Sequence, residues 1–210
     1  MPRRFEPTLG LVVAVATLML LLVGCHWQPE RAAGPIRVVV SIPPLAGLIR
    51  PLLPADASIT MLIQPGRSEH GYEFTARDVA ALAQADLVFY VGMGLEPQVA
   101  SYLRDHPSKS RRDLCLADAV GISVNAVDAH EGHDREEEGH EHGGVDPHIW
   151  LDPSLVAKAI PQIKAAVLAA LQESKSPPDS LMHAESAASK LQSDLAAFDD
   201  QSKAMLTSLS

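Results

Sequence analysis

The sequence lacks the features that mark several common classes of protein. Two cysteines in 210 residues exclude a disulfide framework, and Cys115, set among apolar residues, is expected to be a buried inert thiol rather than a metal ligand or nucleophile. No run of Lys and Arg occurs and the formal net charge is -9, which argues against a nucleic-acid partner because phosphate binding needs clustered cations. The sequence also has no His-Glu-x-x-His, G-x-S-x-G or P-loop motif, which removes three common signatures of enzymes. What is present is an acidic chain that is 47% hydrophobic, enough for a buried core and too apolar for a disordered chain.

Residues 1–24 have the pattern of an export signal. Arg3 and Arg4 precede an uncharged, strongly apolar stretch. The stretch ends at Cys25 in a Leu-Val-Gly-Cys sequence that resembles a bacterial lipobox, so Cys25 is the predicted lipidation site and anchors the chain to a membrane. A single membrane-spanning helix is the alternative, since about 18 uncharged residues can just cross a bilayer. Residues 25–35 are expected to form a linker.

Apolar and β-branched runs predict an α/β lobe over residues 36–175. Buried strands are expected at 36–42, 58–63 and 87–91, with helices at 45–53, from a capping box at Thr75 and Asp78, and through Val99 and Leu103. Alternating strands and helices favour a mostly parallel sheet flanked by helices. Ligands of such sheets bind at the carboxyl ends of the strands, where the loop containing Glu69 and His70 is expected.

Two helices are expected to complete the chain. The first is amphipathic and ends near Gln172, and the second is a long linking helix over residues 179–210 with Asp179 or Ser180 as its N-cap. Apolar residues of the second helix recur at spacings of three and four, broken only by Ser202, and share one face: Leu181, Ala184, Ala188, Leu191, Leu195, Phe198, Met205 and Leu209. Because the pattern runs to the final residues without a C-cap, we expect a chain that is truncated inside this helix.

Two ordered segments contain candidate metal ligands. Glu69 and His70 place a carboxylate and an imidazole in the loop after the second strand, although a lone histidine in such a loop is usually just exposed to solvent. His148 lies between two prolines, and Asp146 or Asp152 could accept a hydrogen bond from its second ring nitrogen, as a metal-bound histidine requires. The alternative for this second segment is a turn capped by Asp-Pro.

Residues 128–144 form a third candidate segment, rich in histidine and acidic residues. It contains no apolar residue larger than alanine, so a surface loop is expected. Imidazoles suit zinc, and the loop could collect metal loosely or serve only as a solvated tether. Its candidate ligands are His130, His133, His140 and His142.

Together these motifs resemble a known family. The motifs are the lipobox, residues 65–74 (PGRSEHGYEF), residues 85–92 (ADLVFYVG), the His-rich loop and residues 146–153 (DPHIWLDP). They resemble the metal-specific substrate-binding proteins of bacterial ABC transporters, in particular the high-affinity zinc-uptake binding proteins. The resemblance covers residues 36–210 in order. It implies two α/β lobes joined by one long helix, with the metal in the cleft between them; the second lobe is missing from this sequence.

The resemblance also implies a ligand set. Position by position, His70 and His148 match the histidine ligands of the first lobe, Glu69 matches a nearby carboxylate, and residues 130–142 match a variable His-rich loop. The family's second lobe supplies a further histidine and commonly a carboxylate. Residues present here therefore provide two or three ligands, whereas a tight zinc site takes four.

The function implied is capture of Zn²⁺ outside the cytoplasm and delivery to a membrane permease and its ATPase, without covalent chemistry. The protein is expected to be a monomeric bacterial lipoprotein, periplasmic or at the cell surface. Paired imidazoles and the His-rich loop favour zinc, whereas a mainly carboxylate set would suit Mn²⁺. Alternatives are a manganese-binding protein, an adhesin-like surface lipoprotein, a zinc buffer that acts without a permease, and a metallohydrolase that uses His70, His148 and a carboxylate.

Overall fold

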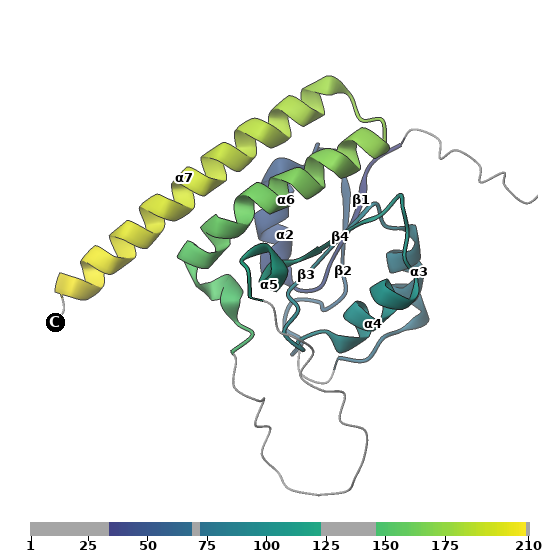
Figure 1. Cartoon of the computed structure of the whole chain (residues 1–210), viewed down its shortest axis with the longest axis horizontal. Coiled ribbons are helices and arrows are strands. Elements are labelled where there is room, and N and C mark those ends of the chain that lie inside the picture. The colour runs from purple at the N-terminus through teal and green to yellow at the C-terminus, as the bar shows by residue number, and fades with distance from the viewer. Residues whose placement is uncertain (1–33, 69–71, 123–145, 209–210) are drawn as a thin grey trace, which may run out of the picture. The chain divides into compact units, whose positions relative to one another are not determined.

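A four-stranded parallel sheet with helices on both faces forms the centre of the computed structural model, which describes residues 34–68, 72–122 and 146–208 (Figure 1). The strands lie in the order β2-β1-β3-β4, and all three strand pairs are parallel. In this register Val38 of β1 lies opposite both Ile59 of β2 and Leu87 of β3. The bounds of the strands are Arg37–Val40 (β1), Ser58–Met61 (β2), Leu87–Tyr90 (β3) and Arg112–Cys115 (β4).

The two central strands are buried on both faces because their side chains are apolar at successive positions. Val38 and Val40 of β1 point into one apolar cluster, and Val39 points into another on the opposite face. β3 alternates in the same way, so that Phe89 and Val88 lie in different clusters. A strand buried on both faces is typical of parallel sheets covered by helices.

Helices cover the two faces in separate groups. The first face carries α2 (Pro43–Ile49), α5 (Leu116–Ala119) and α6 (Pro153–Glu173), and the second carries α3 (Ala76–Gln84) and α4 (Pro97–Asp105). The predicted α/β lobe with a parallel sheet flanked by helices is therefore confirmed. The expected helix at 45–53 begins earlier, at Pro43, and its last turn tightens into the 3-10 helix η2 (Arg50–Leu52), because Pro51 has no N–H to donate.

The topology indicates where on the sheet a ligand would bind. After β1 the chain crosses the first face through α2 to reach β2, whereas after β3 it crosses the second face through α4 to reach β4. The connections therefore leave the adjacent strands β1 and β3 in opposite directions. In open α/β sheets, ligands bind at the carboxyl ends of the strands beside such a switch point.

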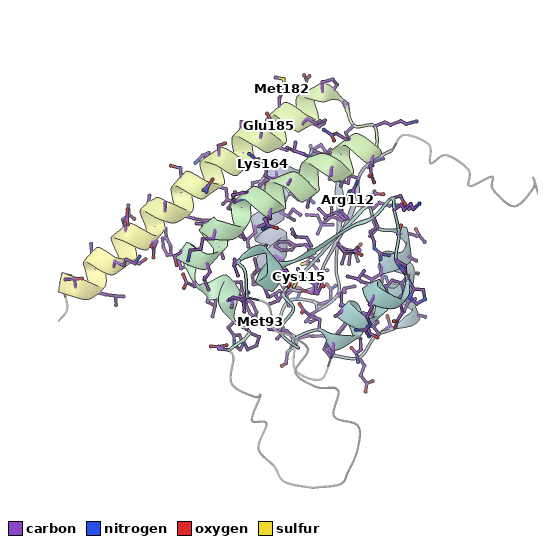
Figure 2. All side chains as sticks on the ribbon, in the orientation of Figure 1. Met93, Arg112, Cys115, Lys164, Met182 and Glu185 are labelled. Atoms are coloured by element: carbon purple, nitrogen blue, oxygen red, sulfur yellow. The ribbon has the colours of Figure 1, made fainter. Side chains whose placement is uncertain are left out.

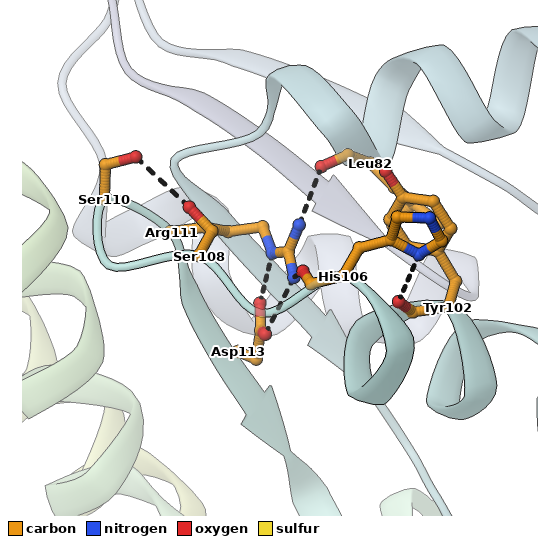
Figure 3. A network of polar contacts seen from close by, with 7 residues as sticks. All are labelled: Leu82, Tyr102, His106, Ser108, Ser110, Arg111 and Asp113. Carbon is orange, nitrogen blue, oxygen red and sulfur yellow. Dashed lines mark hydrogen bonds and ion pairs between the residues drawn. The ribbon is translucent and has the colours of Figure 1, made fainter. Parts of the chain in front are cut away.

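β4 was not expected from the sequence pattern. Its first two residues, Arg112 and Asp113, are charged, and Leu114 is its only buried residue. The strand is preceded by Arg111, whose side chain is almost fully buried. The Arg111 guanidinium forms an ion pair with Asp113 at 2.6 Å and donates to the carbonyl oxygens of Leu82 and His106 (Figure 3). The buried charge is thus satisfied by partners that tie β4 to the ends of α3 and α4.

The last two helices run side by side. α6 ends in a Schellman motif, in which Lys175 adopts a φ of 55° and the Ser176 N–H donates to the Leu171 carbonyl oxygen at 2.9 Å. α7 (Pro178–Ser208) follows as one continuous helix of 31 residues and packs along α6 (Figure 1). The continuous helix agrees with the sequence prediction, although it begins at Pro178, before the expected N-cap.

The apolar face of α7 is covered only along its first half. Ala184 and Ala188 are buried, but Phe198 and Met205 are 58% and 67% exposed. The predicted spacing of apolar residues along α7 is therefore present, but only the first half of this face is buried. α6 is the only helix among the described residues with the length and apolarity of a membrane span, but its buried residues belong to the core of this lobe.

Candidate functional site

His148 lies in a short turn whose geometry is set by Asp146. The Asp146 carboxylate Oδ1 accepts the backbone N–H of His148 at 3.0 Å and lies 2.5 Å from the Nδ1 atom of the same imidazole. The hydrogen bond from the His148 backbone N–H, followed by the one from its ring, lowers the pKa of the Asp146 carboxyl. The Trp150 ring lies 5.0 Å from the imidazole, centroid to centroid. The predicted orienting aspartate is therefore Asp146, and it engages Nδ1.

Asp152, the second aspartate of the motif, has a different role. Its Oδ1 accepts the backbone N–H groups of Ser154 and Leu155, at 2.8 and 3.2 Å, and so caps the N-terminus of α6. Between the two aspartates, Ile149–Leu151 forms the 3-10 helix η3, in which Ile149 is buried in the main core. The packed turn and the capped helix both follow His148, so the chain on its C-terminal side is fixed.

The segment before Glu69 leaves the carboxyl end of β2, as expected. The Ile63 N–H donates to the Ser41 carbonyl oxygen at 2.9 Å, which extends the pairing of β2 with β1 beyond Met61. A turn follows, closed by the Arg67 N–H and the Gln64 carbonyl oxygen at 3.0 Å, with Gly66 at a φ of 81°. Residues 64–68 therefore lie at the edge of the sheet predicted for the ligands.

The segment after residue 71 is anchored at the start of α3. Thr75 and Asp78 form the predicted capping box, in which each side chain accepts a backbone N–H of the other residue. The Asp78 carboxylate also accepts a hydrogen bond from the Tyr72 hydroxyl. Burial alone would raise the pKa of Asp78, but the hydrogen bonds from Thr75 and Tyr72 bring it below its ordinary value. A pocket of about 480 Å³ is lined from both sides of this loop, by Arg67 and Ser68 and by residues 72–75.

Glu96 is a polar residue of this sheet edge that the sequence reasoning missed. It precedes α4 and is 5% exposed, with Oε1 accepting the Val91 N–H at 3.0 Å and Oε2 accepting the Gly92 N–H at 3.1 Å. Burial raises the pKa of its carboxyl, while these two hydrogen bonds from the backbone oppose the rise. A glutamate at the start of a helix normally faces water, so nothing in the sequence indicated this burial.

Cys115 lies at the end of β4 and is half-buried. Its thiol donates to the Val91 carbonyl oxygen at 3.3 Å, and burial raises its pKa. A thiol held in its protonated form is a poor nucleophile and a poor metal ligand. The structure therefore agrees with the predicted inert role, although the residue is less buried than expected.

Figure 2 shows Cys115 and Met93 near the same edge of the sheet, with Arg112 toward the other end of β4.

Of the predicted ligands, the structure describes only His148. Glu69, His70, the loop histidines His130, His133, His140 and His142, and the predicted lipidation site Cys25 lie outside the described residues. Within residues 34–68, 72–122 and 146–208, no three His, Cys, Asp or Glu side chains are grouped as a metal site would need. The described residues show instead how the neighbours of Glu69, His70 and His148 are held.

Comparison with known proteins gives a consistent set of relatives. The family described as "Zinc-uptake complex component A periplasmic" matches residues 38–210. The zinc-binding lipoprotein AdcA of Streptococcus pneumoniae serotype 4 is 28% identical over 156 residues, which cover 74% of this chain and 31% of that protein. The high-affinity zinc uptake system protein ZnuA of Bacillus subtilis is 24% identical over 176 residues, covering 78% of this chain and 52% of the relative.

Solved structures show the same fold. The periplasmic zinc binding protein TroA from Treponema pallidum superposes with a TM-score of 0.61 at 23% identity, covering 80% of this chain and 54% of that one. The Zn(II)-bound AdcA of Streptococcus pneumoniae gives a TM-score of 0.60 at 21% identity, covering 80% of this chain and 32% of that one. The chain thus spans between about a third and about half of the length of these relatives.

The close approach of Gly92 to Cys115 yields a stability prediction. Gly92 has a φ of 86°, and a Cβ added there would lie 2.5 Å from the Cys115 Sγ atom. Gly94 has a similar φ of 79°, but a Cβ added there meets nothing within 4 Å. We expect Gly94→Ala to lower the free energy of unfolding by about 1 kcal/mol through backbone strain, and Gly92→Ala by at least about twice that. Urea unfolding followed by circular dichroism measures both.

A double variant separates the two costs. Cys115→Ala should recover part of the loss in the Gly92→Ala background and none of it in the Gly94→Ala background. Equal losses for the two glycine variants, or no recovery on removing the thiol, would show that the contact does not constrain this edge.

Proposed function

The chain belongs to the family of periplasmic zinc-uptake complex component A proteins, and from this premise we propose that it captures Zn²⁺ outside the cytoplasm for a zinc ABC transporter. In this role the ion is the cargo, and no bond of a substrate is made or broken. Zinc is also named in the descriptions of the AdcA and ZnuA relatives. The proposed site lies at the carboxyl edge of the sheet, and its ligands are assigned to two segments of the chain, one with His70 and the other with His148.

The observation that carries this proposal is the pairing of Asp146 with the His148 imidazole. A carboxylate that accepts the Nδ1 proton selects the tautomer in which Nε2 has a lone pair to give to a metal, and it also fixes the plane of the ring. Asp146 accepts the backbone N–H of the same residue, so the carboxylate and the ring are held to one geometry. We assign Nε2 of His148 as a zinc ligand.

Glu69 and His70 are the other proposed ligands in this part of the chain. The described residues on both sides are fixed, by the turn at Gln64–Arg67 before them and by the Tyr72–Asp78 hydrogen bond after them. Together with His148 they supply two or three of the four ligands of a tetrahedral zinc site. Two imidazoles favour zinc over Mn²⁺, which prefers a mainly carboxylate set.

The His-rich loop has a secondary part in the proposal. His130, His133, His140 and His142 alternate with acidic residues, and together they can hold zinc weakly and exchange it quickly. We propose that this loop collects the ion near the protein and that the tight site lies at the sheet edge.

The proposed partners are a membrane permease and its ATPase, which receive zinc from the protein. A lipid attached to Cys25 keeps a monomeric protein at the membrane surface, where the permease is reached by diffusion in two dimensions. These assignments rest on the family and on the lipobox at Leu22–Cys25.

The ligand assignment predicts that two ordered histidines bind zinc tightly and that the loop does not. We expect His70→Ala and His148→Ala each to weaken zinc binding at least about tenfold, because each removes a side chain that binds the metal directly. Deletion of residues 130–142 should leave the tight site intact. Competition with a chromogenic zinc chelator, at a fixed pH, measures all three variants.

His183→Ala is the matched control for these variants. His183 lies on α7, where its Nε2 contacts the Pro51 carbonyl oxygen at 2.9 Å, away from the proposed site. Its replacement should not change zinc affinity. If deletion of the loop abolished binding while the two point variants bound normally, the proposed site would be wrong.

Replacing the two aspartates of the motif should affect different properties, zinc affinity in one case and stability in the other. Asp146→Ala should weaken zinc binding about tenfold, since the His148 ring loses its orienting partner, with little change in stability. Asp152→Ala should cost about 1 kcal/mol of stability through loss of the α6 cap, with zinc affinity unchanged. Chelator competition and urea unfolding on both variants test this. The same loss of affinity in both would mean that the motif acts as a folding unit and that Asp146 does not orient His148.

A further inference from the structure

The turn that carries His148 also carries Trp150, whose indole lies beside the imidazole of the proposed ligand. We infer that Trp150 is a positioning residue: its ring blocks rotation of the His148 imidazole, so that the imidazole is already oriented when the metal arrives. This inference rests on the proposed function, because it takes His148 as a zinc ligand, and it concerns the His148 ring alone. Indole offers a metal no free lone pair, so Trp150 acts only through the histidine.

The hydrogen bond with Asp146 restrains the imidazole from one side. The Nδ1 atom of His148 meets a single carboxylate oxygen, Oδ1, which also accepts the backbone N–H of the same residue. The Asp146 side chain is 79% exposed, so water competes for this hydrogen bond. The restraint lasts only while the bond is formed, and a ring that keeps one orientation needs a second contact that water cannot replace.

Trp150 supplies that second contact. The centroids of the imidazole and the indole lie 5.0 Å apart, and the two planes are tilted by 56°. This separation lies within the range of about 4.5–7 Å at which aromatic rings contact each other directly. The imidazole cannot turn toward the indole at this distance without a steric clash. The carboxylate and the indole together therefore limit the ring to one orientation.

The indole is itself held by the main core. Trp150 is partly buried and packs against the main core next to Ile149, which is 7% exposed. Its backbone lies in η3, where the Leu151 N–H donates to the His148 carbonyl oxygen at 3.0 Å. Trp150 is thus a fixed wall beside the imidazole, whereas the Asp146 carboxylate lies in solvent.

Orientation of the ring before binding raises its affinity for a metal. A mobile side chain loses rotational freedom when it binds, and this entropic cost reduces the free energy gained on binding. Residues that orient a metal-bound histidine change metal affinity by about 10–100-fold. We place Trp150 at the lower end of this range, because it acts through packing and not through a hydrogen bond.

Trp150→Leu and Trp150→Phe test the inference as a pair. Leucine fills apolar space but presents no flat ring to the imidazole, so we expect zinc affinity to fall about tenfold. Phenylalanine keeps an aromatic face and should bind zinc within about threefold of the unmodified chain. Competition with a chromogenic zinc chelator measures the affinities, and urea unfolding measures the stability of each variant.

Motion of the His148 ring distinguishes positioning from support of the fold. In metal-free chains with ¹³C-labelled histidine rings, NMR relaxation should show a rigid His148 ring in the unmodified chain and in Trp150→Phe, but a mobile one in Trp150→Leu. Nuclear Overhauser contacts between imidazole and indole protons should be present in the unmodified chain. The His148 signals are identified by their absence from His148→Ala. A loss of stability alone would leave the ring motion of the folded molecules unchanged.

Leu151→Ala is the matched control. Leu151 is the next residue of η3 and its side chain is 71% exposed, so its replacement removes apolar surface from the same turn and keeps the N–H that closes it. Zinc affinity and the motion of the His148 ring should match those of the unmodified chain. If Trp150→Leu does not fold, Trp150→Met takes its place, since a flexible methionine fills irregular core space without presenting a flat ring.

The outcomes separate the role of Trp150 from the function on which it rests. Failure of the unmodified chain to bind zinc, or unchanged affinity in His148→Ala, would overturn the proposed function. Zinc binding that needs His148, with the same affinity and ring motion in Trp150→Leu as in the unmodified chain, would overturn the role of Trp150 alone. Equal losses of affinity in Trp150→Leu and Leu151→Ala, or a mobile His148 ring without indole contacts in the unmodified chain, would overturn it as well.

Discussion

Parallel pairing is the constraint on which this structure depends. Neighbouring parallel strands cannot be joined by a tight turn. Each connection must instead leave the carboxyl edge, cross a face of the sheet and return to the amino edge, where the next strand begins. The helices α2, α3 and α4 make these crossings, and the loops that follow β1, β2 and β3 therefore collect at the carboxyl edge. Described segments that are far apart in sequence, such as residues 62–68 and 91–95, lie at this edge because the strands share one direction.

At that edge, carboxylates fix the loops by accepting backbone N–H groups. Asp146 holds the turn at His148, Asp78 holds the segment that follows residue 71, and Glu96 holds the loop after β3. Each carboxylate accepts backbone N–H groups that have no carbonyl partner within the loop. The two that also bind a second side chain, Asp146 with His148 and Asp78 with Tyr72, link backbone geometry to the chemistry nearby.

Features that depend on local pattern could be predicted from the sequence, and features that depend on partners could not. The β-branched run of β1, the capping box at Thr75 and an aspartate beside His148 all follow from residues within a few positions of one another. β4 could not be predicted, because pairing with β3 decides its conformation. Periodicity showed which α7 residues share a face, but not that Phe198 lies where no described element covers it. Glu96 was missed because its burial comes from the folded edge of the sheet.

The central claim is that zinc binds at the carboxyl edge between His70 and His148. The most direct test is an anomalous difference map, collected at the zinc absorption edge, from crystals of the chain grown with Zn²⁺. We expect a peak at about 2.0–2.1 Å from His148 Nε2, with a His70 nitrogen at a similar distance and Asp146 still hydrogen-bonded to Nδ1. A peak bound only by histidines of residues 130–142, with none beside His148, would contradict it.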